Sequence, residues 1–426
     1  KPAARYLKDY KYEKLNIRFM GDYKIIHDSV HGSIRIDEPL LSVIETPEFQ
    51  RLNGIRQLGF NYLVFPGANH TRLEHSLGVS FIAGEIGRRI SMSNEKITLL
   101  KIGGLVHDIG HLPFSHTLEN IFKKYTGLDH VKIGEKIING DIIIENRIGE
   151  DCISHILEKN GIDRKDVIKV FADEEDSESF GKSKNAFESI INGDLDSDQM
   201  DYLLRDSHYT GVAYGSIDLP RILNTVNMIN DMLVFDNKGI EALEGLVVAR
   251  SLMYSSVYFH KTSRIAELML IKAIKDMDFD WKMLIQMNDS DILNFIKNGG
   301  TFQNEIYERL KYRKLYKKVI VLNSIPDEMI NLDTERIEKM ISDFSGVDEK
   351  KIIVDIPFHE LISGDKRLRS FDIRIYRNNR ISFLENESSI VKAIKSRKLV
   401  DYALMIASEK NEIEKVENAA KKILVG

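Results

Sequence analysis

Histidine and aspartate residues with the spacing of metal ligands are concentrated between Gly67 and His130. Eight of the twelve histidines lie within the first 130 residues. His75 lies in a stretch of helical apolar periodicity that opens with a capping-box pattern. His107 and Asp108 close a second such stretch, which a glycine and a proline soon afterwards should end. Imidazole nitrogens and carboxylate oxygens together suit divalent ions such as zinc, iron or manganese, so these three residues predict part of a metal site.

A fourth metal ligand is predicted in the segment NGDLDSDQMDYLLRD, residues 192–206. Asp198, Tyr202 and Arg205 are spaced at i, i+4 and i+7, which places a carboxylate, a phenol and a guanidinium on one helical face. Such a face suits a phosphate ester that is bound to a metal. Each motif alone has a plainer interpretation, because a His-Asp pair is common by chance and a single histidine on an apolar helix is usually structural.

The combined pattern H…HD…D, with GHLPFSH shortly after the HD pair, resembles the HD-domain phosphohydrolase superfamily. The run TPEFQRLNGIRQLGFNYLVFPGANHTRLEHSLGVS, residues 46–80, is similar to the branch of deoxynucleoside triphosphate (dNTP) triphosphohydrolases. The resemblance extends over residues 24–275. It implies one bound divalent metal ion, which would be manganese, iron, zinc, nickel or magnesium. The four implied ligands are His75, His107, Asp108 and Asp198.

The resemblance also implies a fold and an activity. The expected fold is mainly α, an HD-domain helical bundle with a short N-terminal β-hairpin and a small C-terminal α+β appendage. The expected reaction is metal-dependent hydrolysis of dNTPs to a deoxynucleoside and inorganic triphosphate. Two alternatives stay open: another HD nucleotide phosphohydrolase, such as a nucleotidase or a hydrolase of signalling nucleotides, and a non-catalytic nucleotide sensor. A nuclease is disfavoured by the acidic net charge.

Three further histidines, His111, His116 and His130, resemble additional active-site histidines of the family. A group whose pKa is near neutrality can bind phosphate or protonate a leaving oxygen, and the resemblance favours His116 as the proton donor. Arg72 lies at the start of its helix, where a guanidinium and the helix N-terminus together favour an oxyanion. The residues expected to contact the substrate are Gln57, Leu58, Arg72, Tyr202, Arg205, Asp206, Arg250, Tyr254, Tyr258 and Lys261.

Two predicted helices carry many of these residues. Residues 47–58 are predicted to form one helix, and the resemblance places its Gln57 at the sugar of the substrate. Residues 245–274 are predicted to form another, with basic and aromatic side chains at i, i+4, i+8 and i+11 from Arg250 to Lys261. The resemblance assigns the terminal phosphate to Arg250 and the base or sugar to Tyr258. Taken alone, Gln57 and such a stripe would more often be solvated.

The sequence departs from the animal branch at positions that affect specificity. Gln199 and Phe259 stand where that branch has a phosphate-binding lysine and a base-reading glutamine. At the guanine-nucleotide activator site of that branch, two positions match and two differ. The matches are Lys24 and Gln50, and the differences are Glu45 and Asn53. Asparagine cannot replace the planar donors of the arginine found there, so a nucleotide activator is less strongly predicted than a nucleotide substrate.

Composition limits the remaining expectations. The chain of 426 residues has a net charge of −5, which argues against general nucleic-acid binding. Its apolar runs are shorter than the roughly 20 residues that span a bilayer, so no membrane association is expected. The single cysteine, Cys152, fits a reducing compartment, and a cytoplasmic location is expected.

Three parts of the chain are predicted. Residues 1–20 are expected to be an extension that need not be native, with Met20 as the native start. Residues 21–290 form the expected HD core, and residues 291–426 a helical linker with the small α+β region. Hairpin turns are predicted at residues 236–239 and at Asn378-Asn379. In the family the C-terminal region helps to assemble oligomers, so a homodimer or homotetramer is expected.

Overall fold

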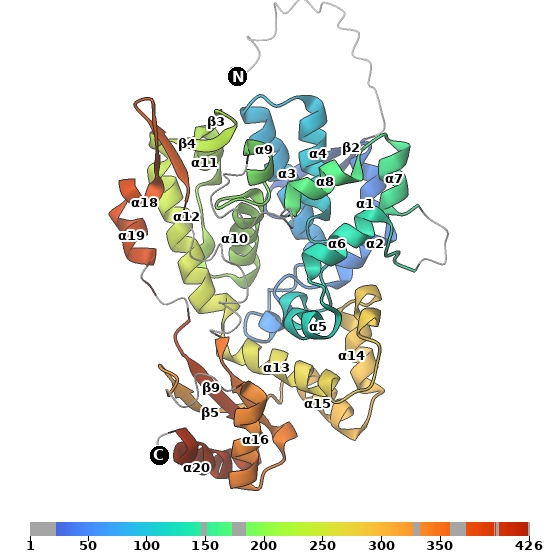
Figure 1. Ribbon diagram of the computed structural model, residues 1–426, viewed down its shortest axis with the longest axis vertical. Helices are drawn as coiled ribbons and strands as arrows, with labels where there is room; N and C mark the ends of the chain where they lie inside the picture. Colours follow the sequence, from blue (N-terminus) through green and yellow to red (C-terminus); the bar gives the residue numbers. More distant parts are fainter. Residues whose placement is uncertain are drawn as a thin grey trace, which may run out of the picture.

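The structure is a computed structural model that describes residues 23–145, 151–172, 185–326, 333–357, 372–395, 397 and 400–424. The predicted extension at residues 1–20 lies outside these described residues. The described chain forms a mainly helical body with an N-terminal β-hairpin and a smaller α+β lobe at its C-terminal end (Figure 1). The predicted fold class is therefore confirmed. Within the described residues, none of the helices has the length and apolarity needed to cross a bilayer.

Two central helices, α3 (Arg72–Arg89) and α4 (Asn94–Val106), pack against each other and position most of the candidate ligands. They approach closely at Gly104, where a Cβ atom would lie 2.7 Å from the Cα atom of Ser80. Each fully buried Leu or Ile in such a core contributes about 1.5–3 kcal/mol to stability. The buried apolar side chains of the pair include Leu77, Ile82, Ile86, Leu100, Ile102 and Leu105.

The other helices of the body surround this pair. The first group precedes or follows it in the N-terminal half: α1 (Leu40–Ile44), α2 (Pro47–Arg51), α5 (Glu119–Thr126), α6 (His130–Asn139), α7 (Ile153–Lys159), α8 (Arg164–Phe171) and α9 (Ala186–Ser189). The second group follows: α10 (Ser197–Thr210), α11 (Leu219–Thr225), α12 (Ile240–Met253), α13 (Lys261–Lys275), α14 (Asp289–Lys297) and α15 (Thr301–Lys311).

Two predicted helices are interrupted. The prediction for residues 47–58 is wrong beyond α2, because the chain leaves the helix and pairs residues 55–57 with the start of α3. The Gln57 N–H donates to the carbonyl of His70 at 3.0 Å, and the Arg72 N–H donates to the carbonyl of Ile55 at 2.9 Å. The prediction for residues 245–274 is also wrong as a single helix, because a π-helical turn over Tyr254–Tyr258 separates α12 from α13.

Short strands form three small sheets. The N-terminal hairpin pairs β1 (Tyr23–Asp28) with β2 (Gly32–Asp37). A four-stranded sheet has the order β3-β4-β7-β8. Its parallel β4–β7 contact joins the C-terminal part of the chain to the body (Figure 1). Its strands are β3 (Val226–Ile229), β4 (Met232–Asp236), β7 (Arg374–Arg377) and β8 (Arg380–Phe383), and α18 (Leu384–Glu387) and α19 (Ser389–Lys395) follow.

One of the two predicted hairpin turns is correct. Asn378 and Asn379 connect β7 to β8 with φ values of 49° and 59°, the positive φ that a tight hairpin turn requires. The turn predicted at residues 236–239 is wrong, because β3 and β4 meet at Asn230 and Asp231, before β4 rather than after it. The Asp236 side chain instead accepts from the Lys238 N–H at 2.9 Å and starts a 3₁₀ turn into α12.

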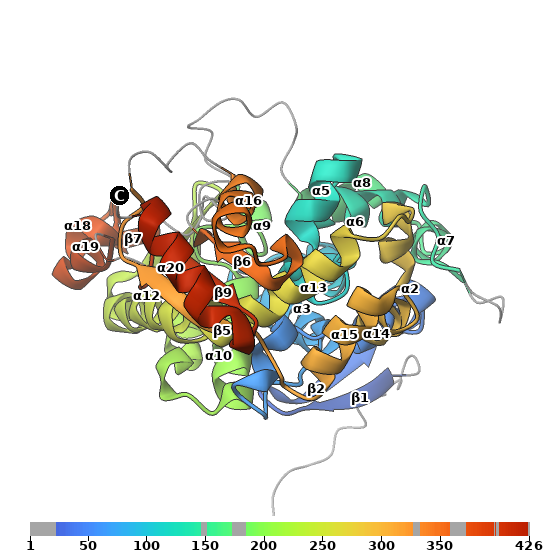
Figure 2. The same ribbon diagram turned by 90° about the horizontal axis from the view of Figure 1, so that it is seen from below.

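The C-terminal lobe has a three-stranded antiparallel sheet in the order β5-β9-β6. Its elements are β5 (Lys317–Leu322), α16 (Thr334–Ser345), β6 (Ile352–Asp355), β9 (Leu404–Ser408) and α20 (Ile413–Leu424). The helices α16 and α20 cover one face of this sheet and form a separate apolar cluster with it (Figure 2). Ile353, Met405 and Ala407 on the strands instead join the main core, so the lobe is packed on the body.

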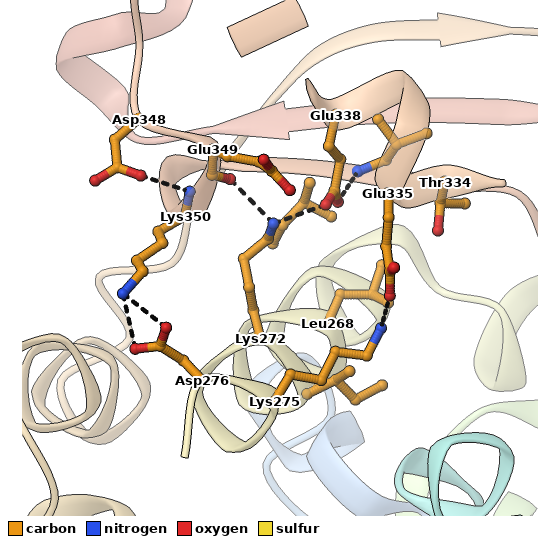
Figure 3. A pocket seen from close by; sticks show the side chains of 13 residues that line it. Leu268, Lys272, Lys275, Asp276, Thr334, Glu335, Glu338, Asp348, Glu349 and Lys350 are labelled. Atoms are coloured by element: carbon orange, nitrogen blue, oxygen red, sulfur yellow. Dashed lines mark hydrogen bonds and ion pairs between the residues drawn. The ribbon is translucent and has the colours of Figure 1, made fainter. Parts of the chain in front are cut away.

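A charged pocket of about 420 Å³ lies between α13 and the C-terminal lobe (Figure 3). Lysines and carboxylates pair across it, with Nζ–O distances of 2.8 Å for Lys272–Glu338, 2.6 Å for Lys275–Glu335 and 2.7 Å for Lys350–Asp276. Glu338 also accepts from the N–H of Val354 at 2.9 Å. Helix α13 is thus held to the lobe at several points.

Candidate metal centre and active site

Three side chains from three helices bring metal-binding atoms together. His75 lies in the first turns of α3, His107 caps the C-terminus of α4, and Asp198 lies in the first turn of α10. His75 Nε2 lies 3.0 Å and His107 Nε2 3.9 Å from Asp198 Oδ1. One ligand atom from each of the three lies within 4.8 Å of the others, which is close enough for a single ion.

Asp108 brings a second carboxylate to the same place. Its Oδ1 lies 3.3 Å from His107 Nε2, and its Oδ2 lies 3.6 Å from His75 Nε2. The Arg72 guanidinium donates to Asp108 Oδ2 at 2.5 Å and to the hydroxyl of Ser115 at 2.9 Å. The four predicted ligands therefore lie together, with a guanidinium beside them.

The hydrogen bonds of the two imidazoles fit a bound cation. His107 Nδ1 faces the carbonyl of Gly104 at 2.9 Å, while its buried Nε2 has no hydrogen-bond partner among the described residues. His75 Nδ1 faces the carboxylate of Asp201 at 2.7 Å. Each ring thus has a hydrogen-bond partner at Nδ1 and turns Nε2 toward the site, as metal-binding histidines usually do.

Charge makes the same cluster selective for a cation. Burial disfavours the charged imidazole of His75, but the carboxylates of Asp198 and Asp201 outweigh it and raise the pKa of His75 to about 10. Burial likewise raises the pKa of Asp198, but the hydrogen bond from His75 and the charges of His75 and His107 lower it to about 2. A metal that binds here must displace a proton from His75, so metal affinity should rise with pH.

A second cluster joins the three further histidines. The rings of His111 and His130 stack with centroids 4.3 Å apart, and the ring of His116 lies 4.8 Å from that of His111. Glu119 in α5 connects them, because its carboxylate faces His116 Nδ1 at 2.8 Å and also contacts His130 Nδ1. His111 Nε2 lies 3.2 Å from Asp108 Oδ1, which joins this cluster to the candidate metal ligands.

The charges of this second cluster are fixed mainly by Glu119. Burial disfavours the charged form of Glu119. The charges and hydrogen bonds of His130 and His116 nevertheless hold the pKa of Glu119 well below its usual range. The Glu119 carboxylate in turn raises the pKa of His130 despite the burial of the ring. His111 differs, since burial and the nearby charges of Arg72 and His130 hold its pKa well below the usual value. The cluster therefore combines a charged pair with a neutral imidazole.

Tyrosines and a carboxylate form the wall next to the metal ligands. Asp206 Oδ2 accepts from the hydroxyl of Tyr258 at 2.8 Å, and its Oδ1 faces His70 Nε2 at 2.7 Å. The ring of Tyr258 lies 6.0 Å from that of Tyr202 and 5.0 Å from that of Tyr254. Burial raises the pKa of both Tyr202 and Tyr258 well above the usual value, so both hydroxyls stay neutral. The π-helical turn carries two of these rings, and such turns are frequent at functional sites.

Other predicted substrate contacts are buried near this wall. The Arg250 guanidinium donates to Gln199 Oε1 at 3.3 Å. Gln199 directly follows the candidate ligand Asp198 in the sequence. Gln57 is 9% exposed, and its Oε1 has no hydrogen-bond partner among the described residues. Leu58 is partly buried and packs on the main core. Gln57 therefore has a polar atom without a hydrogen-bond partner among the described residues, next to the apolar side chain of Leu58.

Two predicted phosphate contacts are engaged elsewhere. The prediction for Arg205 is corrected by its burial: all three of its nitrogens donate to Asp201 or Asp28 at 2.8–3.0 Å, and its side chain is 0% exposed. Lys261 forms an ion pair of 2.5 Å with Asp401 beside the ring of Tyr402. Helical spacing predicted the face that carries each residue, but not the carboxylates that meet it from distant segments.

Three carboxylates of the site were missed by sequence reasoning. Asp201 and Glu119 each stand three residues after a predicted site residue, Asp198 and His116, so helical spacing alone could have suggested them. No sequence signal pointed to Asp289, which lies at the start of α14. Its Oδ1 accepts from the Phe114 N–H at 2.6 Å.

Asp289 fixes the loop that carries His116. Its Oδ2 accepts from the N–H of Arg56 at 3.0 Å, and its bond to Phe114 anchors a residue with a φ of 56°. Such a φ is unfavourable for a non-glycine residue. Burial raises the pKa of Asp289 from 3.8 to about 6 in spite of these donors.

This raised pKa predicts a pH dependence of stability. The folded chain binds the proton more tightly than the unfolded chain, so the contribution of Asp289 is largest below the unfolded pKa and is lost as the pH rises through about 6. Between about pH 4.5 and pH 7.5 the unfolding free energy of the wild type should fall relative to that of Asp289→Asn by about 2 kcal/mol. Urea unfolding of both proteins at the two pH values measures this difference. Parallel profiles would contradict the prediction.

Comparisons with known proteins agree with this geometry. A family model described as the HD domain matches residues 72–204, and one described as the HD associated region matches residues 217–425. An uncharacterized protein of Methanocaldococcus jannaschii is 36% identical over 416 residues, which cover 93% of this chain and 82% of that protein. The deoxynucleoside triphosphate triphosphohydrolase SAMHD1 homolog of Dictyostelium discoideum is 29% identical over 356 residues, which cover 78% of this chain and 66% of that protein.

A solved structure agrees as well. A phosphohydrolase from Bacteroides thetaiotaomicron has a TM-score of 0.69 and 25% identity, and the match covers 91% of this chain and 100% of that chain. The helical body and the histidine-aspartate cluster define an HD-domain protein. Together with the matched regions and relatives, they show that the chain belongs to the HD-domain phosphohydrolase family.

Proposed function

We propose that this protein is a metal-dependent dNTP triphosphohydrolase, which converts a dNTP and water into a deoxynucleoside and inorganic triphosphate. The observation that carries the proposal is the convergence of metal-binding atoms from His75, His107 and Asp198 within 4.8 Å, next to buried guanidinium groups. The name of the Dictyostelium relative supports the choice of substrate.

Each group of site residues has a separate role in the proposed reaction. His75, His107, Asp108 and Asp198 would hold a divalent metal ion, which would supply polarisation of a phosphoryl oxygen and a lowered pKa for a water molecule. Arg72 and Arg250 neutralise phosphate charge, since a guanidinium can donate two parallel hydrogen bonds to an oxyanion. His116, oriented by Glu119, protonates the 5′-oxygen as its bond to the α-phosphorus breaks. His111 and His130 complete the cluster around that oxygen.

The nucleoside is proposed to lie against the tyrosine wall. Tyr202, Tyr254 and Tyr258 supply ring surface, and Leu58 supplies apolar contact. Each carboxylate oxygen of Asp206 already accepts one hydrogen bond but has capacity for another, so Asp206 can accept from a sugar hydroxyl. Gln57 offers its amide to the same hydroxyl.

Four further expectations belong to this proposal. Lys261 can reach a phosphate only if it releases Asp401, so its contribution should depend on the C-terminal region. A nucleotide activator is a weaker expectation, because Lys24 at the matching position is paired with Glu45 on the surface. A homodimer or homotetramer and a cytoplasmic location complete the proposal.

Product analysis tests the proposal. The purified protein, loaded separately with manganese, iron, zinc, nickel or magnesium, would be incubated with the four dNTPs, with and without GTP, and its products separated by ion exchange. Deoxynucleoside together with intact triphosphate is the expected result. Monophosphate, diphosphate or orthophosphate would instead indicate another HD phosphohydrolase. Saturable nucleotide binding without turnover would favour the sensor.

A further inference from the structure

Asp201 is the most heavily hydrogen-bonded carboxylate near the candidate metal centre. It is fully buried in α10, one helical turn after the ligand Asp198. Its Oδ2 faces His75 Nδ1 at 2.7 Å, and its Oδ1 faces His31 Nε2 at 2.6 Å. Arg205 donates to both oxygens, at 2.8 and 3.0 Å. The carboxylate is therefore held in one orientation by donors from three separate elements.

The chain makes room for this arrangement on α3. A Cβ atom at Gly78 would lie 1.8 Å from Asp201 Oδ1 and 2.6 Å from Arg205 Nη2. Only a glycine at this position lets α10 bring the carboxylate and the guanidinium so close to the helix that carries His75. The Asp201–Arg205 pair is thus built into the packing of α3 on α10.

The third donor comes from the N-terminal hairpin. His31 lies in the turn between β1 and β2, and its side chain is 3% exposed. Asp28 at the end of β1 accepts from the N–H of His31 at 2.7 Å and from Arg205 Nη1 at 2.8 Å. The hairpin turn therefore contacts both Asp201 and the arginine that holds Asp201.

These contacts link His31 to His75 through the carboxylate of Asp201. The Asp201 carboxylate accepts from His75 Nδ1, which turns Nε2 of the same ring toward Asp198 and the candidate metal site. Without the His31 donor, Oδ1 of Asp201 keeps only its bond from Arg205, so the carboxylate is held less firmly against His75. Groups that orient a metal ligand in this way typically change metal affinity by about 10–100-fold when they are replaced.

We propose that His31 is a positioning residue of the metal centre: through Asp201 it fixes the ring of His75, so that the N-terminal hairpin belongs to the metal-binding unit. The inference rests on the proposed role of His75 as a ligand. It is independent of which phosphate ester the enzyme hydrolyses.

Titration of the metal-free full chain with Co²⁺ tests the proposal, because the visible absorption of bound Co²⁺ reports its ligand geometry. His31→Phe keeps an aromatic ring but removes the donor, and it should weaken Co²⁺ binding by about 10–100-fold and change the absorption spectrum. His31→Gln can still donate to Asp201 and should restore much of the affinity. His27→Gln is the matched control, since His27 is exposed on the same hairpin and faces only the Ser33 hydroxyl, at 3.3 Å.

Two results would overturn the proposal. The first leaves the proposed metal centre in place, and the second excludes it. If His31→Phe binds Co²⁺ with the affinity and spectrum of the wild type while His75→Ala does not, His31 has no positioning role but the metal centre stands. If Co²⁺ binding is unaffected by His75→Ala and His107→Ala, the proposed metal centre fails, and the inference fails with it. A double variant tests whether His31 acts through Asp201: His31→Phe should have little further effect on Co²⁺ binding in an Asp201→Asn background.

Discussion

Replacement of His107 by alanine is expected to lower kcat/KM for phosphate-ester hydrolysis by about 10³-fold or more, because the metal supplies several kcal/mol of transition-state stabilisation. His107 Nε2 is buried without a hydrogen-bond partner among the described residues, so its loss removes a ligand and little else. The change also removes the Nδ1 bond to the carbonyl of Gly104 and the edge contact of the ring with His75. Steady-state kinetics and metal analysis of the purified variant measure the effect.

A matched variant separates loss of the metal from loss of the fold. His155 is also a histidine beside an aspartate, but its side chain is 58% exposed and it pairs with Asp151 on the surface. His155→Ala should retain full activity and full metal content. His107→Ala should keep the helical circular dichroism of the wild type while its bound metal falls. A His107→Ala protein that retained both metal and turnover would exclude His107 as a ligand.

The grouping of His75, His107 and Asp108 as candidate metal ligands could be predicted from sequence because its signals are local. A capping box fixed the start of the helix that carries His75, and the apolar period of residues 97–106 placed His107 and Asp108 at a helix end. The structure adds that these ends meet, which only the packing of α3, α4 and α10 determines. The resemblance to the HD family supplied that long-range information for Asp198.

The partners of the charged residues could not be predicted in the same way. Arg205 and Lys261 share helical faces with candidate site residues, but Asp28 and Asp401 reach them from distant parts of the chain. Periodicity says which side of a helix a residue occupies and nothing about the segment that covers it. The same limit explains why Asp289 was missed, since its partners Arg56 and Phe114 are brought to it only by tertiary packing.

The two predicted hairpin turns show how local chemistry can mislead. Asn378-Asn379 and Asn230-Asp231 are both pairs that tolerate positive φ, and both form turns. The segment after β4 also contains turn-forming residues, but the Asp236 side chain caps a 3₁₀ turn there and directs the chain into α12. Composition alone does not distinguish a hairpin turn from a helix start.

Replacement of Glu119 by glutamine is expected to lower kcat by about 10²–10³-fold, the range in which a positioned proton donor contributes. The carboxylate faces His116 and His130 together, and it raises the pKa of His130. Glutamine keeps the shape of the side chain but removes the charge that stabilises a protonated imidazole. If His130 is the proton donor, the descending alkaline limb of the pH–rate profile should move to lower pH, because the loss of the Glu119 charge lowers the raised pKa of His130.

Double variants identify which histidine Glu119 serves. If His116 donates the proton, His116→Asn should already remove that step, so Glu119→Gln should add little to it. If His130 is the donor, the non-additive pair should be His130→Asn with Glu119→Gln. The exposure of the two rings favours the first outcome, because the His116 side chain is 67% exposed and the His130 side chain 27%. Glu158→Gln, at an exposed surface position, should leave both the rate and the pH profile unchanged, and purely additive effects for both pairs would remove Glu119 from the proton-transfer step.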